Sequence, residues 1–201
     1  MNSNPLRDVG FQEEFFEVER LSKLFYETDR DYLIIHSICS DQHYKPMHNV
    51  LTWVETPLKN AMLGDIRISR KDMNGRPMRE YCVYIDVKYS RDWPCASISF
   101  RKYSDSPRSD AMRHICDLVG RDVKNDFWYM SIGTSGRRMF ALTDIQDYIR
   151  NPANEEKLRE VCQHGKWDNG QETWFMPLDK INVPSMSFPE WLTEELDQRI
   201  G

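Results

Sequence analysis

Three runs of alternating apolar residues follow one another between Leu63 and Tyr103. They read LGDIRIS, YCVYIDVKY and CASISFRKY, and they are rich in the β-branched and aromatic residues that favour strands. Asn74-Gly75 lies between the first two runs, and this dipeptide is typical of a two-residue β-hairpin turn. The pattern predicts three consecutive antiparallel strands, of which the first two form a hairpin.

A helix is predicted before these strands. Residues 11–26 carry apolar side chains at helical spacing, at Phe11, Phe15, Val18, Leu21 and Phe25. At about 100° per residue, Glu14 falls inside this apolar stripe, whereas Glu17 falls at its edge. Glu14 is therefore the acid expected to point inward. Residues 27–63 are left open, since the run DYLIIHSI within them fits either a buried strand or the end of another helix.

The rest of the chain predicts further helices and strands. A helix over residues 108–120 precedes a second hairpin over residues 126–143. Three short helices follow, with a Thr143-x-x-Gln146 capping box on the first, a Gly165 C-cap on the second and Ser187-x-x-Glu190 on the third. The strand-like ETWFMPL lies between the second and third. We expect an α/β fold in one domain, residues 1–201, with a central mixed sheet flanked by helices.

Charge and cysteine usage bear on location and partners. The formal net charge is −5, yet in residues 66–138 Lys and Arg exceed Asp and Glu by six. The five cysteines are scattered and include no C-x-x-C pair, which favours reduced thiols. No run approaches the roughly 20 apolar residues that span a bilayer. We expect a cytoplasmic protein without a membrane partner.

Three charges gather on the predicted hairpin. Asp86 and Lys88 project from one face of the second strand because side chains alternate. A two-residue Asn74-Gly75 turn would place Asp65 opposite Tyr84, as the diagonal neighbour of Asp86 at roughly 7–8 Å. At that distance two carboxylates can share a hard divalent cation such as Mg²⁺, or Mn²⁺ in its place. A metal there with a nearby lysine suits phosphodiester hydrolysis.

The spacing of these residues resembles the PD-(D/E)XK nuclease superfamily. The resemblance maps its motif onto Asp65, Asp86 and Lys88, and its inward glutamate onto Glu14. It implies a restriction-endonuclease-like core over about residues 11–145 and a C-terminal extension over about 146–201. It also implies an Mg²⁺-dependent endonuclease, with Asp65, Asp86 and the Val87 carbonyl as metal ligands. Gly64 departs from the family, which frequently has proline there, and Asp86 stands where glutamate is more common.

Basic residues surround this candidate site. They indicate a nucleic-acid partner, because phosphate contacts dominate such binding. We expect DNA rather than RNA. The residues expected to contact nucleic acid are Arg67, Arg70, Lys71, Arg76, Arg79, Arg101 and Lys102, with Arg108 and Arg113 further along. Homodimers are frequent among nucleases that cut both strands, so the resemblance allows a homodimer.

Two other interpretations stay open. His36, Cys39, His43 and His48 are residue types that bind Zn²⁺, although their spacing matches no standard zinc pattern. A non-catalytic protein-binding module, such as an inhibitor or adaptor, would instead use the acidic ends of the chain and its aromatic residues. Binding of Mg²⁺ or Mn²⁺ distinguishes the nuclease from the protein-binding module, because a module that only binds protein has no need of Asp65 and Asp86.

Overall fold

The computed structural model describes residues 5–37, 52–55, 64–117, 126–166 and 170–201. The chain divides into two compact units, Met1–Val87 with Pro189–Gly201, and Lys88–Phe188. The protein is α/β and contains a mixed sheet, as the sequence predicts. A single domain over residues 1–201 stays a prediction.

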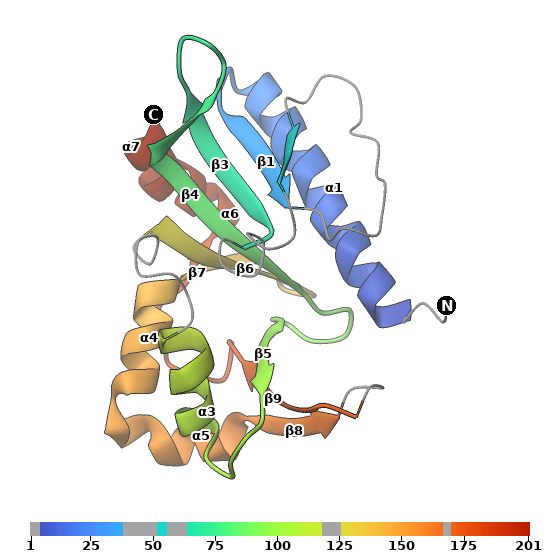
Figure 1. Cartoon of the computed structure of the whole chain (residues 1–201), viewed down its shortest axis with the longest axis vertical. Helices are drawn as coiled ribbons and strands as arrows, with labels where there is room; N and C mark the ends of the chain where they lie inside the picture. The colour runs from blue at the N-terminus through green and yellow to red at the C-terminus, as the bar shows by residue number, and fades with distance from the viewer. Residues whose placement is uncertain (1–4, 38–51, 56–63, 118–125, 167–169) are drawn as a thin grey trace. The chain divides into compact units, whose positions relative to one another are not determined.

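The first unit packs a long helix on a mixed sheet. Its strands lie in the order β4-β3-β1-β2, where β1 and β2 are parallel and the other neighbours antiparallel. Helix α1 contacts β1 (Figure 1). Val18, Leu21 and Phe25 of the predicted stripe are buried. The elements are α1 (Pro5–Glu27), β1 (Leu33–Ser37), β2 (Thr52–Glu55), β3 (Ile66–Lys71), β4 (Pro77–Tyr89), α6 (Phe188–Trp191), a π-helical turn (Leu192–Leu196) and α7 (Asp197–Ile200).

The β3–β4 hairpin closes through a three-residue loop, so the predicted two-residue turn is wrong. The Asp72 amide donates to the Arg76 carbonyl at 2.9 Å, and the Gly75 amide donates to the Asp72 carbonyl at 2.9 Å. Gly75 has a φ of +74°, which suits the left-handed position that ends such a loop. The Asp72 carboxylate accepts from the Asn74 amide, which further holds the turn.

A bulge in β4 then changes the register. Between the pairs Lys71↔Pro77 and Ser69↔Cys82, β3 advances two residues while β4 advances five. Ser69 Oγ accepts from the Met78 amide at 3.1 Å and so satisfies a donor that the ladder omits. Tyr84 therefore lies opposite Arg67, not opposite Asp65 as the sequence predicts.

The second unit contains the remaining strands and most of the short helices that the structure describes. Its elements are β5 (Ser97–Arg101), α3 (Pro107–Ala111), a π-helical turn (Met112–Cys116), β6 (Phe127–Gly133), β7 (Gly136–Ala141), α4 (Leu142–Arg150), a 3₁₀ turn (Pro152–Asn154), α5 (Glu155–Val161), β8 (Gln163–Lys166), β9 (Glu172–Pro177) and β10 (Met186–Ser187). Strand β7 pairs with β6 and β10, which confirms the second predicted hairpin.

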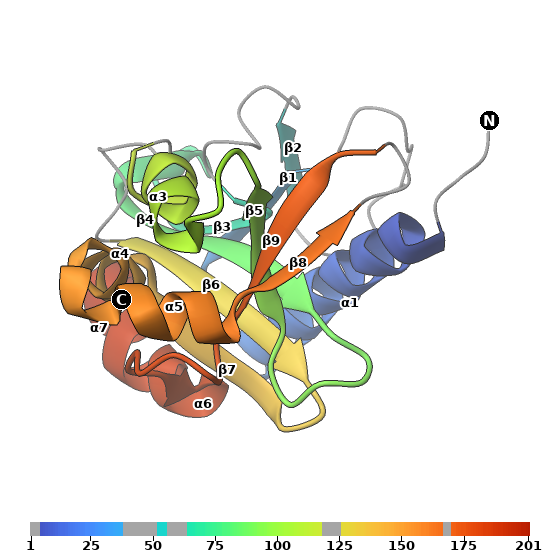
Figure 2. The same ribbon diagram turned by 90° about the horizontal axis from the view of Figure 1, so that it is seen from below.

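Strand β5 does not continue the antiparallel series predicted from the sequence. It pairs with β9, whose Pro177 lies 80 residues beyond its partner Ser97 in the chain, and forms the three-stranded sheet β5-β9-β8. Helix α5 contacts β9 and α3 (Figure 2). Alternation along a strand predicts its faces but not its neighbour, because pairing depends on distant chain.

Two predicted helix ends are also wrong. Helix α4 begins at Leu142 with Ala141 as N-cap, and no side chain caps it. Gln146 is buried and donates to the Ile115 carbonyl at 2.9 Å, so it serves packing rather than a capping box. Gly165 lies inside β8, where a Cβ would come within 2.7 Å of the Phe175 ring. Gly165 therefore leaves room for the Phe175 ring and does not end a helix.

The last helix of the first unit is held by a charged network. Arg30 Nε donates to Asp197 Oδ1 at 2.9 Å, and the Tyr32 hydroxyl donates to the same oxygen at 2.9 Å. The Arg30 hydrogen bond lowers the pKa of Asp197, while burial and the Asp197 hydrogen bond raise the pKa of Tyr32 to about 12. This network fixes α7 to the connection between α1 and β1.

Within the described part of the chain, no helix has the length and apolar character needed to cross a membrane.

Candidate functional site

Asp65 lies where the β3–β4 ladder ends. Its amide donates to the Ile85 carbonyl at 2.9 Å, and its Oδ2 accepts from the Val87 amide at 2.7 Å. The carboxylate thus replaces a main-chain acceptor for β4 beyond the last ladder pair, Ile66↔Ile85. The contact brings Asp65 to the residue next to Asp86.

Gly64 explains how the chain reaches this position. It has a φ of +76°, and a Cβ added to it would lie 2.7 Å from the Ile85 carbonyl oxygen. Proline holds φ near −65° and is incompatible with this backbone. The backbone at Gly64 therefore excludes proline, because the chain turns tightly against β4.

Asp86 and Lys88 occupy the last residues of β4. Both are half-buried, whereas Val87 between them is 7 % exposed. Their side chains leave the strand on the same face because they are two residues apart. Residues Cys82 to Ile85 just before them are buried on both faces, so Asp86 and Lys88 lie where solvent reaches one face of the strand again.

The donor set suits a hard divalent metal. Asp65 and Asp86 supply carboxylate oxygens, and the Val87 carbonyl is a main-chain oxygen beside them. Mg²⁺ commonly takes one or two protein carboxylates and keeps several waters. Among the described residues, no group of three or more His, Cys, Asp or Glu side chains is placed to hold a metal. A metal bound by Asp65 and Asp86 would have two protein carboxylates and would keep several waters.

Helix α1 buries a different acid from the one expected. Glu17 is 1 % exposed and pairs with Arg20, whereas Glu14 is half-buried. The buried positions on α1 run from Glu17 to Phe25, so Glu14 lies about one turn before them. The helical stripe alone does not reveal where along the helix the sheet begins to cover it.

The predicted basic residues of the first unit are not equivalent. Arg67 is 8 % exposed on β3, which removes it from the open surface. Arg70 is exposed and lies over the Tyr81 ring, 5.4 Å from Cζ to the ring centroid. Lys71 pairs with Asp31, and Arg76 is exposed at the hairpin loop. The side chain of Arg79 lies outside the described residues.

The second unit holds a cation–aromatic cluster, Arg101, Tyr103, Arg113 and His114. The Arg113 and Arg101 guanidinium carbons lie 4.4 Å and 5.0 Å from the Tyr103 ring centroid. The His114 ring stacks on Tyr103 at 5.3 Å with an interplanar angle of 8°. Burial, followed by the charge of Arg113, lowers the pKa of His114. Neither arginine forms an ion pair with any residue in the described ranges.

Asp110 holds the backbone beneath this cluster. Its Oδ2 accepts from the Tyr103 amide at 2.9 Å, the Ser104 amide at 3.0 Å and Trp174 Nε1 at 3.1 Å. Burial acts to raise the pKa of Asp110, but the hydrogen bonds from Tyr103 and Ser104 outweigh it and leave the pKa lowered. Lys102 is instead paired with Asp105 at 2.9 Å. Arg101 and Lys102 are both predicted to contact nucleic acid. Arg101 is better placed to bind an anion, because Lys102 is already paired with Asp105.

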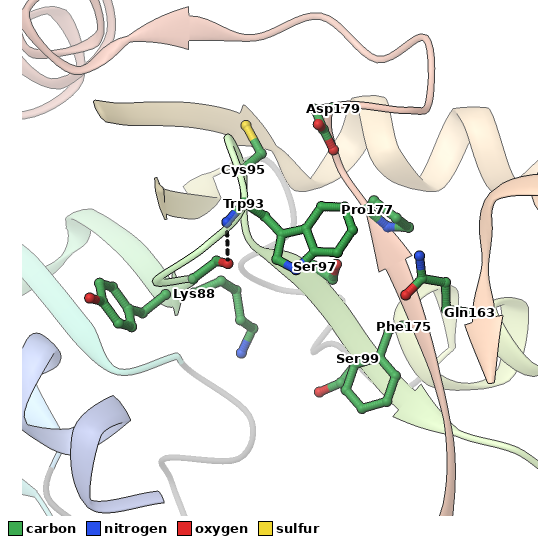
Figure 3. A pocket seen from close by; sticks show the side chains of 11 residues that line it. Lys88, Trp93, Cys95, Ser97, Ser99, Gln163, Phe175, Pro177 and Asp179 are labelled. Atoms are coloured by element: carbon green, nitrogen blue, oxygen red, sulfur yellow. Dashed lines mark hydrogen bonds between the residues drawn. The ribbon is translucent and has the colours of Figure 1, made fainter. Parts of the chain in front are cut away.

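A cavity of about 340 Å³ lies in the second unit, and Lys88 lines it (Figure 3). Its other walls come from the segment after β4, from β5, from β9 and from the start of β8. Sequence reasoning missed this cavity and the Tyr103 cluster. The interleaving of basic and aromatic residues in Arg101-Lys102-Tyr103 and Arg113-His114 was the available signal for the cluster.

The candidate zinc ligands are not placed by the structure. His36 lies on β1, but its side chain and the whole of Cys39, His43 and His48 lie outside the described residues.

Comparisons with protein-family models, curated proteins and solved structures find no match to this chain.

Proposed function

We propose that this protein is a metal-dependent nuclease that hydrolyses phosphodiester bonds of nucleic acid, DNA before RNA. The observation that carries the proposal is the hydrogen bond from the Val87 amide to Asp65 Oδ2 at 2.7 Å. It holds Asp65 against Val87, the residue that follows Asp86, at one end of the β3–β4 hairpin, although Asp65 and Asp86 are 21 residues apart in the chain.

The order of elements supports the same proposal. A helix, α1, precedes the hairpin, and a strand, a helix and a strand follow β4 as β5, α3 and β6. This is the chain order that the resemblance to PD-(D/E)XK nucleases implies. Order alone is shared by many α/β proteins, so the acidic pair carries more weight.

Each residue of the motif has a distinct role in this proposal. Asp65, Asp86 and the Val87 carbonyl would hold Mg²⁺ or Mn²⁺, and the metal would supply Lewis-acid stabilisation of the charge on the phosphate. Lys88 hydrogen-bonds the attacking water and orients it toward phosphorus. The Val87 amide holds the Asp65 carboxylate in place. Glu14 remains a further candidate near the helix edge.

Nucleic-acid binding rests on exposed cations. Arg101 and Arg113 share one tyrosine ring and have no acidic partner among the described side chains. Two like charges held together favour an anion, and phosphate oxygens match the guanidinium geometry. Arg70 and Arg76 on the first unit add exposed positive charge.

The cytoplasm is the proposed location. No disulfide links the four cysteines that the structure describes, Cys82, Cys95, Cys116 and Cys162. Burial raises the pKa of Cys162 to about 12, so this thiol stays protonated and unreactive. Free cysteines suit a reducing compartment. A homodimer is the proposed assembly for double-strand cutting, and light scattering measures it.

The test is cleavage of labelled single-stranded and duplex DNA and RNA with Mg²⁺, Mn²⁺ or EDTA. The wild type should cut only with metal, and Asp86→Asn and Lys88→Ala should each cut at least about 100-fold more slowly. Asp117→Asn makes the same chemical change at an exposed carboxylate and should cut like the wild type.

Calorimetry with Mn²⁺ completes the test, because it detects the metal without turnover. Wild-type cutting that survives in Asp86→Asn would contradict the site assignment. Absence of both cutting and Mn²⁺ binding in the wild type would favour the protein-binding module.

A further inference from the structure

The floor of the cavity is one face of the three-stranded sheet. Ser99 on β5 and Gln163 on β8 are both paired with Phe175 on β9, and Ser97 is paired with Pro177. Cross-strand partners share a face, so these five side chains emerge together. All five line the cavity (Figure 3). Ile98 and Phe100, which alternate with the serines, are buried on the opposite face of β5.

Trp93 adds an aromatic wall. It is 52 % exposed, and Figure 3 shows its indole between Lys88 and Gln163. Its amide donates to Ser90 Oγ at 3.2 Å, and Lys180 Nζ lies 5.3 Å from its ring centroid. The cavity therefore offers two flat aromatic surfaces, Trp93 and Phe175, at its walls and floor. Flat aromatic surfaces bind flat ring systems by stacking.

The polar groups of the cavity are available to a ligand. The side chains of Ser97, Ser99 and Gln163 make no hydrogen bond with any residue that the structure describes. A glutamine amide both donates and accepts, and serine hydroxyls do the same. Asp179 at another edge of the cavity adds an acceptor. A lipid chain would leave these groups unsatisfied, whereas a heterocycle with donors and acceptors on its edge would satisfy them.

We propose that this cavity binds one nucleobase of the nucleic-acid substrate, in a single-stranded stretch, with the base stacked on Trp93 and its edge bonded to Gln163. This inference rests on the proposed function. The cavity volume of about 340 Å³ falls at the lower end of ligand pockets, which suits one nucleotide better than a base pair. Because Lys88 lines the cavity, the bound nucleotide adjoins the phosphate that this lysine serves.

The test measures binding without cleavage, using Asp86→Asn protein in EDTA and a short fluorescent single-stranded DNA. Trp93→Ala should weaken binding about tenfold through lost stacking, and Gln163→Ala should weaken it severalfold. Tyr26→Ala removes an equally aromatic side chain that is 89 % exposed on α1 and should change binding less than twofold. Unfolding curves of each variant check that the fold is kept.

A second arm uses nucleoside monophosphates, which distinguish a nucleotide pocket from a site that requires a polymer. Quenching of tryptophan fluorescence by a monophosphate, lost in Trp93→Ala, would show that one nucleotide suffices. If the oligonucleotide binds in a Trp93-dependent way and the monophosphate does not bind, the cavity holds a base only as part of a polymer, which also supports the proposal. Wild-type binding by both Trp93→Ala and Gln163→Ala would overturn it.

The outcome is separable from that of the nuclease proposal. Metal-dependent cutting with binding indifferent to Trp93 and Gln163 would leave the nuclease and remove the base pocket. Trp93-dependent binding by a protein that never cuts would leave the pocket and remove the nuclease.

Discussion

The Val87 amide donates to Asp65 Oδ2 at 2.7 Å, so one of the two carboxylates proposed as metal ligands also accepts a backbone hydrogen bond from β4. Structural and chemical roles therefore coincide in Asp65, and substitutions can separate them. Asp65→Asn keeps a side-chain acceptor for the amide, whereas Asp65→Ala removes it.

We expect Asp65→Ala to lower the free energy of unfolding by about 1–3 kcal/mol, because it leaves the Val87 amide without its acceptor. Asp65→Asn should cost less, yet both variants should lose Mn²⁺ binding. Urea unfolding and calorimetry measure the two effects. Equal stabilities of the two variants would show that the hydrogen bond contributes little.

Gly64 and Gly75 form a matched pair for backbone strain. Their φ values are +76° and +74°, but only Gly64 has an atom within reach of an added Cβ, the Ile85 carbonyl oxygen at 2.7 Å. We expect Gly75→Ala to cost about 1 kcal/mol, the left-handed penalty alone. Gly64→Ala should cost at least about twice as much and weaken Mn²⁺ binding, because Asp65 must move. Equal costs would contradict the close approach at Gly64.

The Tyr32–Asp197 pair predicts the pH dependence of stability. The pKa of Tyr32 is raised to about 12 from 10.0, so its contribution is complete below pH 10 and is lost as pH rises toward 12. The pKa of Asp197 is lowered from 3.8, so its contribution is present above that value and is lost as pH falls through the folded pKa.

Tyr32→Phe should cost about 1 kcal/mol at pH 7 and flatten the alkaline decline. Tyr26→Phe, at an exposed ring, should retain the decline. Urea unfolding from pH 3 to pH 12 measures both, and an unchanged alkaline slope in Tyr32→Phe would refute the assignment.

Salt dependence of oligonucleotide binding tests the Tyr103 cluster. Arg113→Gln and Arg101→Gln should each reduce the slope of log affinity against log salt by about one, because each removes one phosphate contact. Arg159→Gln is the control, since Glu155 already pairs with Arg159 at 3.1 Å. Slopes that match the wild type in both cluster variants would place nucleic acid elsewhere.

Local pattern predicted the elements of this chain better than their partners. The helix over residues 11–26, the strands around Ile66 and Asp86 and the hairpin at Gly133 to Gly136 are present, because each depends on alternation or periodicity within one segment. The pairing of β5 with β9 joins residues far apart in the chain, 80 positions at Ser97↔Pro177, and no local signal specifies it.

The candidate site shows the same division. Alternation correctly places Asp86 and Lys88 along one strand, but the register at Asp65 depends on the bulge after Pro77. Which glutamate of α1 is buried depends on where β1 meets the helix, and the buried one is Glu17. The cavity beside Trp93 is assembled from four separate segments, which no single stretch of sequence reveals.

The bulge held by Ser69 and Met78 has a consequence for engineering this protein. It separates the register of the hairpin loop from that of the pairs between Ser69↔Cys82 and Ile66↔Ile85. Residues inserted between Met73 and Arg76, such as a short epitope or a fluorophore attachment peptide, would lengthen an exposed loop and should leave these pairs in register. The loop is thus a suitable handle for labelling or immobilising the protein while Asp65 and Val87 keep their contact.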